Sequence, residues 1–141
     1  MNRGPIVLVE DDVDDKIFFE RVLADLKVPN TLVWLKNGEE AYDYLLNTSD
    51  KPFIIFCDIN MPLINGIELK KRINASSYLQ GKSTPFVFYT TTSNPAFIKT
   101  AYSEYVVQGF FVKPIDSKDM HYLIKIILEY WKLCKHPDSD Y

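Results

Sequence analysis

Four short apolar runs in the 141-residue sequence are each followed directly by side chains that can carry out chemistry. In chain order these side chains are Glu10, Asp11 and Asp12; Asp58; Thr90; and Lys113. Carboxylates that converge on one place repel one another unless a cation lies between them, and oxygen ligands with room for water suit Mg²⁺. A carboxylate can also act as a nucleophile and take a phosphoryl group, whose oxygens Mg²⁺ and an ammonium group would neutralise. These residue types therefore predict a Mg²⁺-dependent transfer of a phosphoryl group to Asp58.

Five short apolar runs must position these side chains. All five are rich in β-branched and aromatic residues: Ile6–Val9, Thr31–Leu35, Phe53–Cys57, Phe86–Tyr89 and Gly109–Val112. Runs this short and continuous are typical of strands buried on both faces, as in a parallel sheet. The carboxyl ends of parallel strands form one edge of the sheet, where α/β proteins place their functional crevice. We therefore expect the acids, Thr90 and Lys113 to meet at that edge.

Segments with helical spacing separate the runs. In four of them apolar residues recur on one helix face: Phe19, Val22, Leu23 and Leu26; Ala41, Leu45 and Leu46; Leu69 and Ile73; and Met120, Leu123, Ile124, Ile127 and Trp131. Asn94-Pro95 indicates the start of a further helix, and Ser117 is the expected cap of the last one. The alternation of strands and helices predicts an α/β domain with a mainly parallel sheet and right-handed crossovers.

Composition and charge exclude several classes of protein. The net charge is −3 and no basic stripe indicates binding to nucleic acid or to an anionic membrane surface. The longest apolar run, Phe53–Cys57, is too short for a membrane span or a signal peptide. The two cysteines, Cys57 and Cys134, match neither a disulfide framework nor a metal site. We expect a cytoplasmic protein with one domain over residues 5–134 and a polar tail over residues 135–141.

From Pro5 to about Leu133 the sequence resembles the receiver domain of bacterial two-component response regulators. The matching motifs are the paired acids Glu10 and Asp11; the phosphoacceptor block Asp58, Met61-Pro62 and Gly66; the switch hydroxyl Thr90; the switch aromatic Phe110; and the pair Lys113-Pro114. Five motifs in the same order, each after the expected strand, make a specific match. The resemblance implies a flavodoxin-like (βα)5 fold of three layers, with strand order 2-1-3-4-5.

The resemblance also implies a role for each acid. Asp58 would accept a phosphoryl group from a histidine kinase or a phosphotransfer protein. Asp11 and Asp58 would bind Mg²⁺ directly, together with the backbone carbonyl of Asn60, and Glu10 would act mainly through water.

The remaining motifs imply a phosphate contact and a switch. Lys113 would contact the phosphoryl oxygens, with a cis bond to Pro114. Thr90 would move to bond the phosphoryl group, and Phe110 would turn inward behind it. These movements would convert phosphorylation into a change of the protein surface.

Three further side chains are expected to tune the lifetime of the phosphate. Asn60 and Thr92 stand two residues beyond Asp58 and Thr90, at positions that have this role in the family. The position after the switch hydroxyl is usually small in receivers, and here it is Thr91. We expect the bulkier side chain to narrow access to the phosphate and to alter dephosphorylation.

Other polar residues near these motifs have ordinary structural explanations. Asp12, Asp14 and Asp15 suit the amino terminus of the first helix, where negative charge is favourable, and we expect no more of them. His121 and His136 are expected to be exposed, without a metal-binding or phosphorylation role.

The last helix carries a second apolar set opposite its core face. The set consists of Tyr122, Ile126, Tyr130 and Leu133. These residues are either scattered surface aromatics, which are common, or a surface for a partner or a second copy of the chain. In the second interpretation the surface comprises the fourth helix, the fifth strand and the fifth helix, the face that receivers use for signalling. It would extend over Tyr102, Tyr105 and Val106.

Three functions remain to be distinguished. The first is a stand-alone phosphorylatable switch that is not an enzyme and signals through protein–protein contacts. The second is an adaptor of receiver fold that works without phosphorylation, although such adaptors typically lose part of the Asp, Thr and Lys set that this sequence keeps. The third is a phosphatase with an aspartyl nucleophile, which would usually need a second Asp where Asn60 stands.

Overall fold

The computed structural model describes residues 4–135 of the chain. Its five strands are β1 (Ile6–Val9), β2 (Leu32–Leu35), β3 (Ile54–Cys57), β4 (Phe86–Thr90) and β5 (Gly109–Val112). All paired strands are parallel, and they lie in the order β2-β1-β3-β4-β5. The predicted flavodoxin-like fold and its strand order are therefore confirmed. His136 and most of the predicted tail lie outside the described residues.

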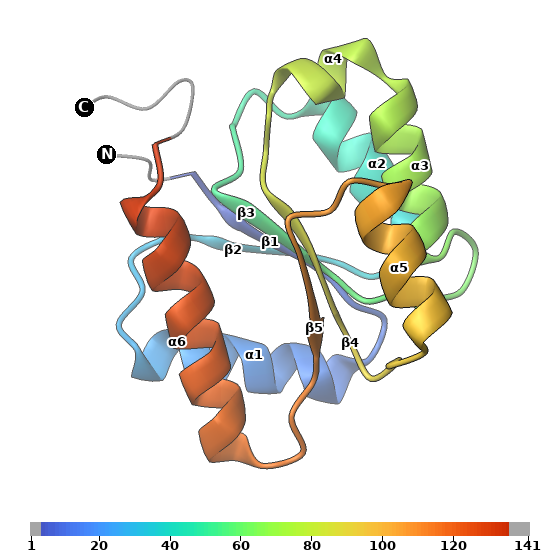
Figure 1. Cartoon of the computed structure of the whole chain (residues 1–141). Coiled ribbons are helices and arrows are strands. Elements are labelled where there is room, and N and C mark those ends of the chain that lie inside the picture. The colour runs from blue at the N-terminus through green and yellow to red at the C-terminus, as the bar shows by residue number, and fades with distance from the viewer. Residues whose placement is uncertain (1–3, 136–141) are drawn as a thin grey trace.

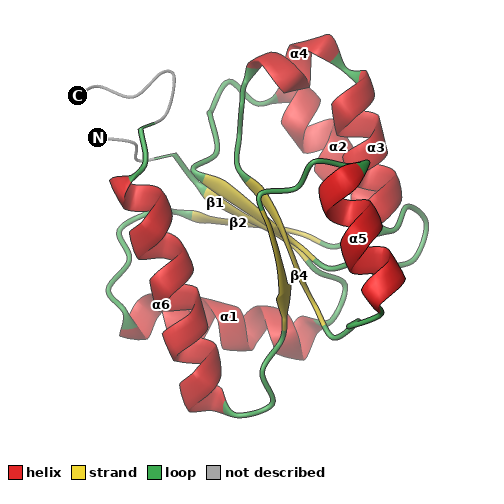
Figure 2. Cartoon of the chain, viewed as in Figure 1, coloured by secondary structure: helices red, strands yellow, loops and turns green. Residues whose placement is uncertain are grey.

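Residues 4–135 contain six helices. They are α1 (Val13–Asp25), α2 (Gly38–Asn47), α3 (Gly66–Ala75), α4 (Ser77–Gly81), α5 (Pro95–Ser103) and α6 (Ser117–Leu133). Helices α1 and α6 cover one face of the sheet, and α2 to α5 cover the other, so that the molecule has three layers (Figures 1 and 2). Within the described range no helix is long and apolar enough to cross a membrane.

The central strands are buried on both faces, which explains their continuous apolar sequences. In β1, Ile6 and Leu8 pack into the core beneath α1 and α6, whereas Val7 and Val9 pack into the core beneath α2 and α3. Because both layers of helices need apolar partners, side chains of either orientation along the strand must be apolar. The polar residues can therefore begin only where the strands end.

Two local predictions were wrong. The short helix α4 was not expected; Ser76 ends α3 and also caps α4, where its hydroxyl accepts the backbone N–H of Leu79 at 3.2 Å. Ser117 is the first residue of α6 rather than its cap. The cap is Asp116, because its carboxylate accepts the N–H of Lys118 at 2.7 Å. The expected fourth and fifth helices are thus α5 and α6, and Asn94 caps α5 as predicted.

Candidate functional site

Three carboxylates meet at the carboxyl edge of the sheet. Glu10 and Asp11 follow β1, and Asp58 follows the neighbouring strand β3, whose last residue Cys57 pairs in register with Val9. One oxygen from each of the three carboxylates lies within 4.8 Å of the others. Glu10 and Asp58 are buried and Asp11 is exposed. The parallel register therefore brings the predicted acids together, with one side of the cluster open to solvent.

The loop after β3 fixes the position of Asp58. The Asp58 Oδ1 atom accepts the backbone N–H of Ile59 at 2.8 Å, and the N–H of Gly66 donates to the Ile59 carbonyl at 2.9 Å. A Cβ atom on Gly66 would lie only 2.1 Å from the Asp58 carbonyl oxygen. Since only glycine allows this approach, the first residue of α3 packs directly against the backbone that carries Asp58.

Lys113 connects the acids that follow β1 and β3. Its amine contacts the carboxylates of Glu10 at 2.5 Å, Asp15 at 2.9 Å and Asp58 at 3.6 Å. The lysine side chain is 7% exposed, and its backbone N–H donates to the Thr90 carbonyl at 2.7 Å. The amine is therefore held among three acids at the place where the sequence predicted it.

Asp15 does more than the sequence suggested. We expected it only to favour the amino terminus of α1, but it binds the Lys113 amine. Asp12 does cap α1, because its carboxylate accepts the N–H groups of Asp14 and Asp15. Asp15 lies in the first turn of α1, directly after the loop that carries Glu10 and Asp11, and this closeness to the strand end is the signal that could have indicated a shared position.

Burial and charge perturb the ionisation of the site. Burial raises the pKa of Glu10 to about 7, and the charge of Asp58 adds to this, although hydrogen bonding by Lys113 opposes it. Burial acts to lower the pKa of Lys113, but its hydrogen bonds to Glu10 and Asp15 and the charge of Asp58 outweigh burial and raise that pKa. Three carboxylates contact the one ammonium group, and Asp11 lies beside two of them, so the site has an excess of negative charge. An all-oxygen donor set with this excess fits Mg²⁺.

Hydroxyl and amide side chains lie beside the acids. Thr90, at the end of β4, is fully buried, and its Oγ1 atom accepts the N–H of Thr92 at 3.4 Å. The side-chain amide of Asn60 donates to the Thr92 hydroxyl at 2.9 Å, which links the loop after β3 to the loop after β4. Thr91 is exposed. Two of the three positions named for phosphate lifetime, Asn60 and Thr92, are thus in direct contact with each other.

The predicted switch aromatic lies on the edge strand β5. Phe110 is half-buried, and its ring packs edge-on against Phe88 with the ring centroids 5.8 Å apart. Its backbone N–H donates to the Tyr102 hydroxyl at 2.9 Å, so α5 is tied to β5 beside this ring. The predicted cis bond before Pro114 was wrong, because every peptide bond in residues 4–135 is trans. A proline bond allows either isomer at small cost, which is why the motif alone did not decide it.

The residues of the proposed partner face differ in their exposure to solvent. Tyr122, Ile126, Tyr130 and Leu133 of α6 and Tyr102 and Val106 near α5 are exposed. Tyr105 is half-buried and packs against the core, so it contributes less surface than expected. His121 also has a partner that the sequence did not reveal, since its Nε2 atom lies 2.9 Å from the Asp25 carboxylate and links α6 to α1.

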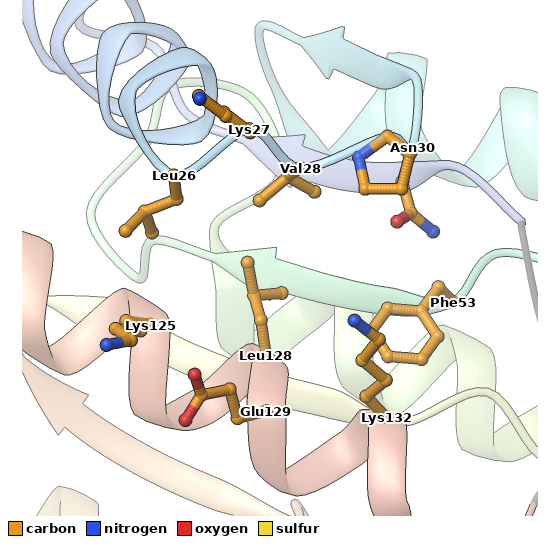
Figure 3. Close-up of a pocket in the computed structure, with 10 residues that line it drawn as sticks. Leu26, Lys27, Val28, Asn30, Phe53, Lys125, Leu128, Glu129 and Lys132 are labelled. Carbon is orange, nitrogen blue, oxygen red and sulfur yellow. The ribbon is translucent and has the colours of Figure 1, made fainter.

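A cavity of about 340 Å³ lies at the opposite, amino edge of the sheet, between the turn after α1 and helix α6 (Figure 3). Apolar side chains and lysines line it, among them Leu26, Val28, Phe53, Leu128, Lys27, Lys125 and Lys132. None of the predicted site residues is in its wall. The candidate site is therefore recognised by its converging charges and not by its volume.

Comparisons with known proteins agree with this geometry. The model of the response regulator receiver domain matches residues 6–125. The chain is 28% identical over 130 residues to the probable methanogenesis regulatory protein FilR2 of Methanothrix harundinacea, covering 89% of this chain and 82% of that protein. It is 28% identical over 131 residues to the response regulator Rcp1 of Synechocystis, covering 89% of this chain and 87% of Rcp1.

Two solved structures are similar over almost their full length. The phosphorylated cyanobacterial phytochrome response regulator RcpA matches with a TM-score of 0.87 and 27% identity, over 96% of this chain and 99% of that one. The Mn²⁺-bound form of Rcp1 matches with a TM-score of 0.83 and 26% identity, over 95% and 99%. Among the similar proteins are thus one that has been phosphorylated and one that binds a divalent cation.

Proposed function

Because the chain belongs to the response regulator receiver domain family, we propose that Asp58 accepts a phosphoryl group from a histidine kinase or a phosphotransfer protein. The observation that carries this proposal is the meeting of Glu10, Asp11 and Asp58, whose carboxylate oxygens lie within 4.8 Å of one another, with the Lys113 amine 3.6 Å from Asp58. We take the receiver domain to span residues 5–134. It is a phosphoacceptor and not an enzyme that acts on a separate substrate.

The acids would hold one Mg²⁺ ion. Asp11 and Asp58 would bind the ion directly with the carbonyl oxygen of Asn60, and Glu10 would contribute through water. When bound, Mg²⁺ supplies positive charge that neutralises the phosphoryl oxygens during transfer. Glu10 and Asp58 are buried and their positions are fixed by the strands, so this charge would be placed without rearranging the backbone.

Asp58 and Lys113 would perform the transfer. An oxygen of the Asp58 carboxylate would attack the phosphorus, the bond from phosphorus to the donor histidine nitrogen would break, and that nitrogen would take a proton from solvent. The Asp58 Oδ2 atom is the one that faces Lys113. The Lys113 amine would turn from its contacts with Glu10 and Asp15 to the new phosphoryl oxygens, which carry about −2 charge.

Thr90 and Phe110 would convert phosphorylation into a signal. Among residues 4–135 the buried Thr90 hydroxyl accepts the N–H of Thr92 and donates to no side chain or carbonyl, so its hydrogen atom is available for a phosphoryl oxygen. Movement of Thr90 would leave space beside β4 into which the ring of Phe110 could turn. Because the Phe110 N–H bonds to Tyr102, the same movement would reach α5 and the exposed face formed by α5, β5 and α6.

The output would be a protein–protein contact at that face. A second copy of the chain or a different protein could occupy it, and neither nucleic acid nor a membrane is required. Asn60 stands where an aspartyl phosphatase would need an acid, and its amide is already bonded to Thr92. No observation therefore favours the phosphatase.

The experiment that tests the proposal is the intact mass of the protein after incubation with Mg²⁺ and acetyl phosphate. One added phosphoryl group is expected for the wild type and none for Asp58→Asn or after chelation of Mg²⁺. An adduct on Asp58→Asn, or none on the wild type, would contradict the proposal. In the latter case the adaptor that works without phosphorylation becomes the better account.

A further inference from the structure

One buried charged side chain lies outside the site described above. Among the described residues four polar side chains are buried, and three of them, Glu10, Asp58 and Thr90, belong to the phosphorylation site. The fourth is Lys70 of α3, which is 7% exposed. Lysine is almost never buried to this extent without a partner. Its environment therefore needs a physical explanation.

The Lys70 amine has an aromatic ring beside it but no counter-ion. It lies 5.1 Å from the centroid of the Phe86 ring, and within residues 4–135 no carboxylate comes within ion-pairing distance of it. Burial lowers the pKa of this amine. The face of an aromatic ring compensates only part of the solvation that an ammonium group loses, whereas an anion would compensate most of it.

Lys70 lines a polar cavity of about 520 Å³. The other polar residues in the wall that matter here are Asn74, Gln80, Ser83, Thr84 and Gln108. Ser83 and Thr84 precede β4 and Gln108 precedes β5, so the cavity lies at the amino edge of the sheet, away from Asp58 at the carboxyl edge.

Hydrogen bonds to the backbone hold the cavity wall in place. The side-chain amide of Asn74 donates to the Tyr105 carbonyl, and that of Gln80 donates to the Asn74 carbonyl. The side-chain amide oxygen of Gln108 accepts the backbone N–H of Phe86. These contacts join α3 and α4 to the segments that lead into β4 and β5. The cavity is thus a preformed space and not a gap between mobile side chains.

We propose that this cavity binds a small oxyanion, such as inorganic phosphate or a short carboxylate, which pairs with the Lys70 ammonium group. Ser83 and Thr84 line the same space, and each has a hydroxyl that can donate to an oxygen of the anion. The site goes beyond the proposed function, because it shares no residue with the acidic cluster and needs neither Mg²⁺ nor Asp58.

Glu104 is the alternative partner within the chain. It also lines the cavity, is exposed, and forms no ion pair with Lys70 in the described structure. Rotation of its side chain could bring the carboxylate to the amine, which would leave no place for an anion. The experiment must therefore separate an added anion from Glu104.

The test is an anion titration of the full chain in the presence of EDTA, followed by amide NMR and by thermal unfolding. Sodium phosphate and sodium acetate are each compared with sodium chloride at equal ionic strength, which distinguishes a tetrahedral oxyanion from a carboxylate. We expect saturable shifts at Lys70, Ser83, Thr84 and Gln108. At ten times the dissociation constant the Tm should rise by about 4–6 °C relative to chloride.

Lys70→Met is the variant that should lose both effects, because it keeps an unbranched side chain only one atom shorter and removes the charge. Lys71→Met is the matched control, since Lys71 is the next residue of α3, is exposed and, among residues 4–135, forms an ion pair with Glu68 alone. Phosphate also stabilises proteins without binding, and that contribution should be equal in the two variants. Asp58→Asn should keep both the NMR shifts and the rise in Tm. The anion site can therefore be tested even if Asp58 is not phosphorylated.

Three outcomes would overturn the proposal. The first is that no saturable shift appears near Lys70 in the wild type up to about 50 mM anion, which covers millimolar affinities. The second is that Lys70→Met responds as Lys71→Met does. The third is that Glu104→Gln alone moves the Lys70 signals while no anion does, which would identify Glu104 as the counter-ion. The wild-type titration remains decisive even if Lys70→Met does not fold.

Discussion

We predict that Asp15 competes with the proposed phosphoryl group on Asp58 for the Lys113 amine, and Asp15→Asn tests this. The Lys113 amine lies 2.9 Å from Asp15 but 3.6 Å from Asp58. The amine can approach a phosphoryl group on Asp58 only by giving up part of its contact with Asp15. Asp15→Asn preserves the size of the side chain and removes its charge.

The expected size of the effect follows from the exposure of the two partners. Hydrogen bonds to charged groups contribute about 1.5–3 kcal/mol, whereas exposed ion pairs contribute about 0–1 kcal/mol. The Lys113 side chain is 7% exposed and that of Asp15 is 43% exposed, so we expect a contribution of about 1 kcal/mol. Asp15→Asn should lower the free energy of unfolding by that amount and accelerate phosphorylation about five-fold, because the competing contact is gone.

Two measurements are needed. Urea denaturation gives the change in the free energy of unfolding, and a time course of intact mass with acetyl phosphate and excess Mg²⁺ gives the rate of phosphorylation. Asp14→Asn is the matched control, because it removes the same charge from the neighbouring exposed residue of α1. The control should leave the rate unchanged.

The reasoning would be refuted by a loss of stability without faster phosphorylation. An unchanged rate would show that the contact with Asp15 stabilises the fold only. A slower rate would show that Asp15 positions Lys113 for the transfer instead of competing for it.

Three further predictions concern the packing, pH dependence and phosphate lifetime. Gly66→Ala should lower the free energy of unfolding by about 1–3 kcal/mol in urea denaturation, because the added Cβ would clash with the Asp58 carbonyl; Gly81→Ala, which meets no atom within 4 Å, should not destabilise. The hydrogen bond to Asp25, with that to the Ser117 carbonyl, raises the pKa of His121 above its usual 6.5. Its stabilising contribution should therefore be complete below pH 6.5 and be lost as pH rises through the higher folded-state pKa. An NMR titration of the imidazole should show this pKa, and Asp25→Asn should lower it; equal values in the two proteins would contradict the assignment. Thr92→Val removes the acceptor for Asn60 and should shorten the half-life of phosphorylated Asp58 about two- to five-fold, because one hydrogen bond of about 1 kcal/mol no longer joins the loops beside the phosphate. The half-life is measured by the decay of the phosphorylated mass. An unchanged half-life would show that the hydrogen bond between Asn60 and Thr92 does not slow the attack of water on the phosphoryl group.

The convergence of the site was predictable because the strands are short, apolar and parallel. Buried parallel strands must end together at one edge, so polar residues that directly follow them must meet there. Glu10, Asp58, Thr90 and Lys113 could therefore be placed at that edge without knowledge of any contact. The order of the elements and the position of each polar residue after its strand were sufficient.

Contacts that depend on the rotation of a helix could not be predicted in this way. The contact of Asp15 with Lys113 depends on which face of α1 points toward the sheet edge, and acidic residues at a helix start have a sufficient local explanation. The hydrogen bond from Phe110 to Tyr102 depends on the packing of α5 against an edge strand. Helix α4 has five residues, which is too short to show a helical period. The burial of Lys70 could not be predicted, because a lysine that follows a core residue such as Leu69 along a helix normally lies on the exposed face.

The central claim is that Asp58 is phosphorylated through the acids and Lys113. The most direct measurement is the intact mass of the wild type and of Asp58→Asn after incubation with acetyl phosphate, with Mg²⁺ and with Mg²⁺ chelated. The account predicts one added phosphoryl group on the wild type, which disappears in Asp58→Asn and when the metal is removed. A wild type that gains no phosphoryl group, or gains it equally without Mg²⁺ or without Asp58, would contradict the account.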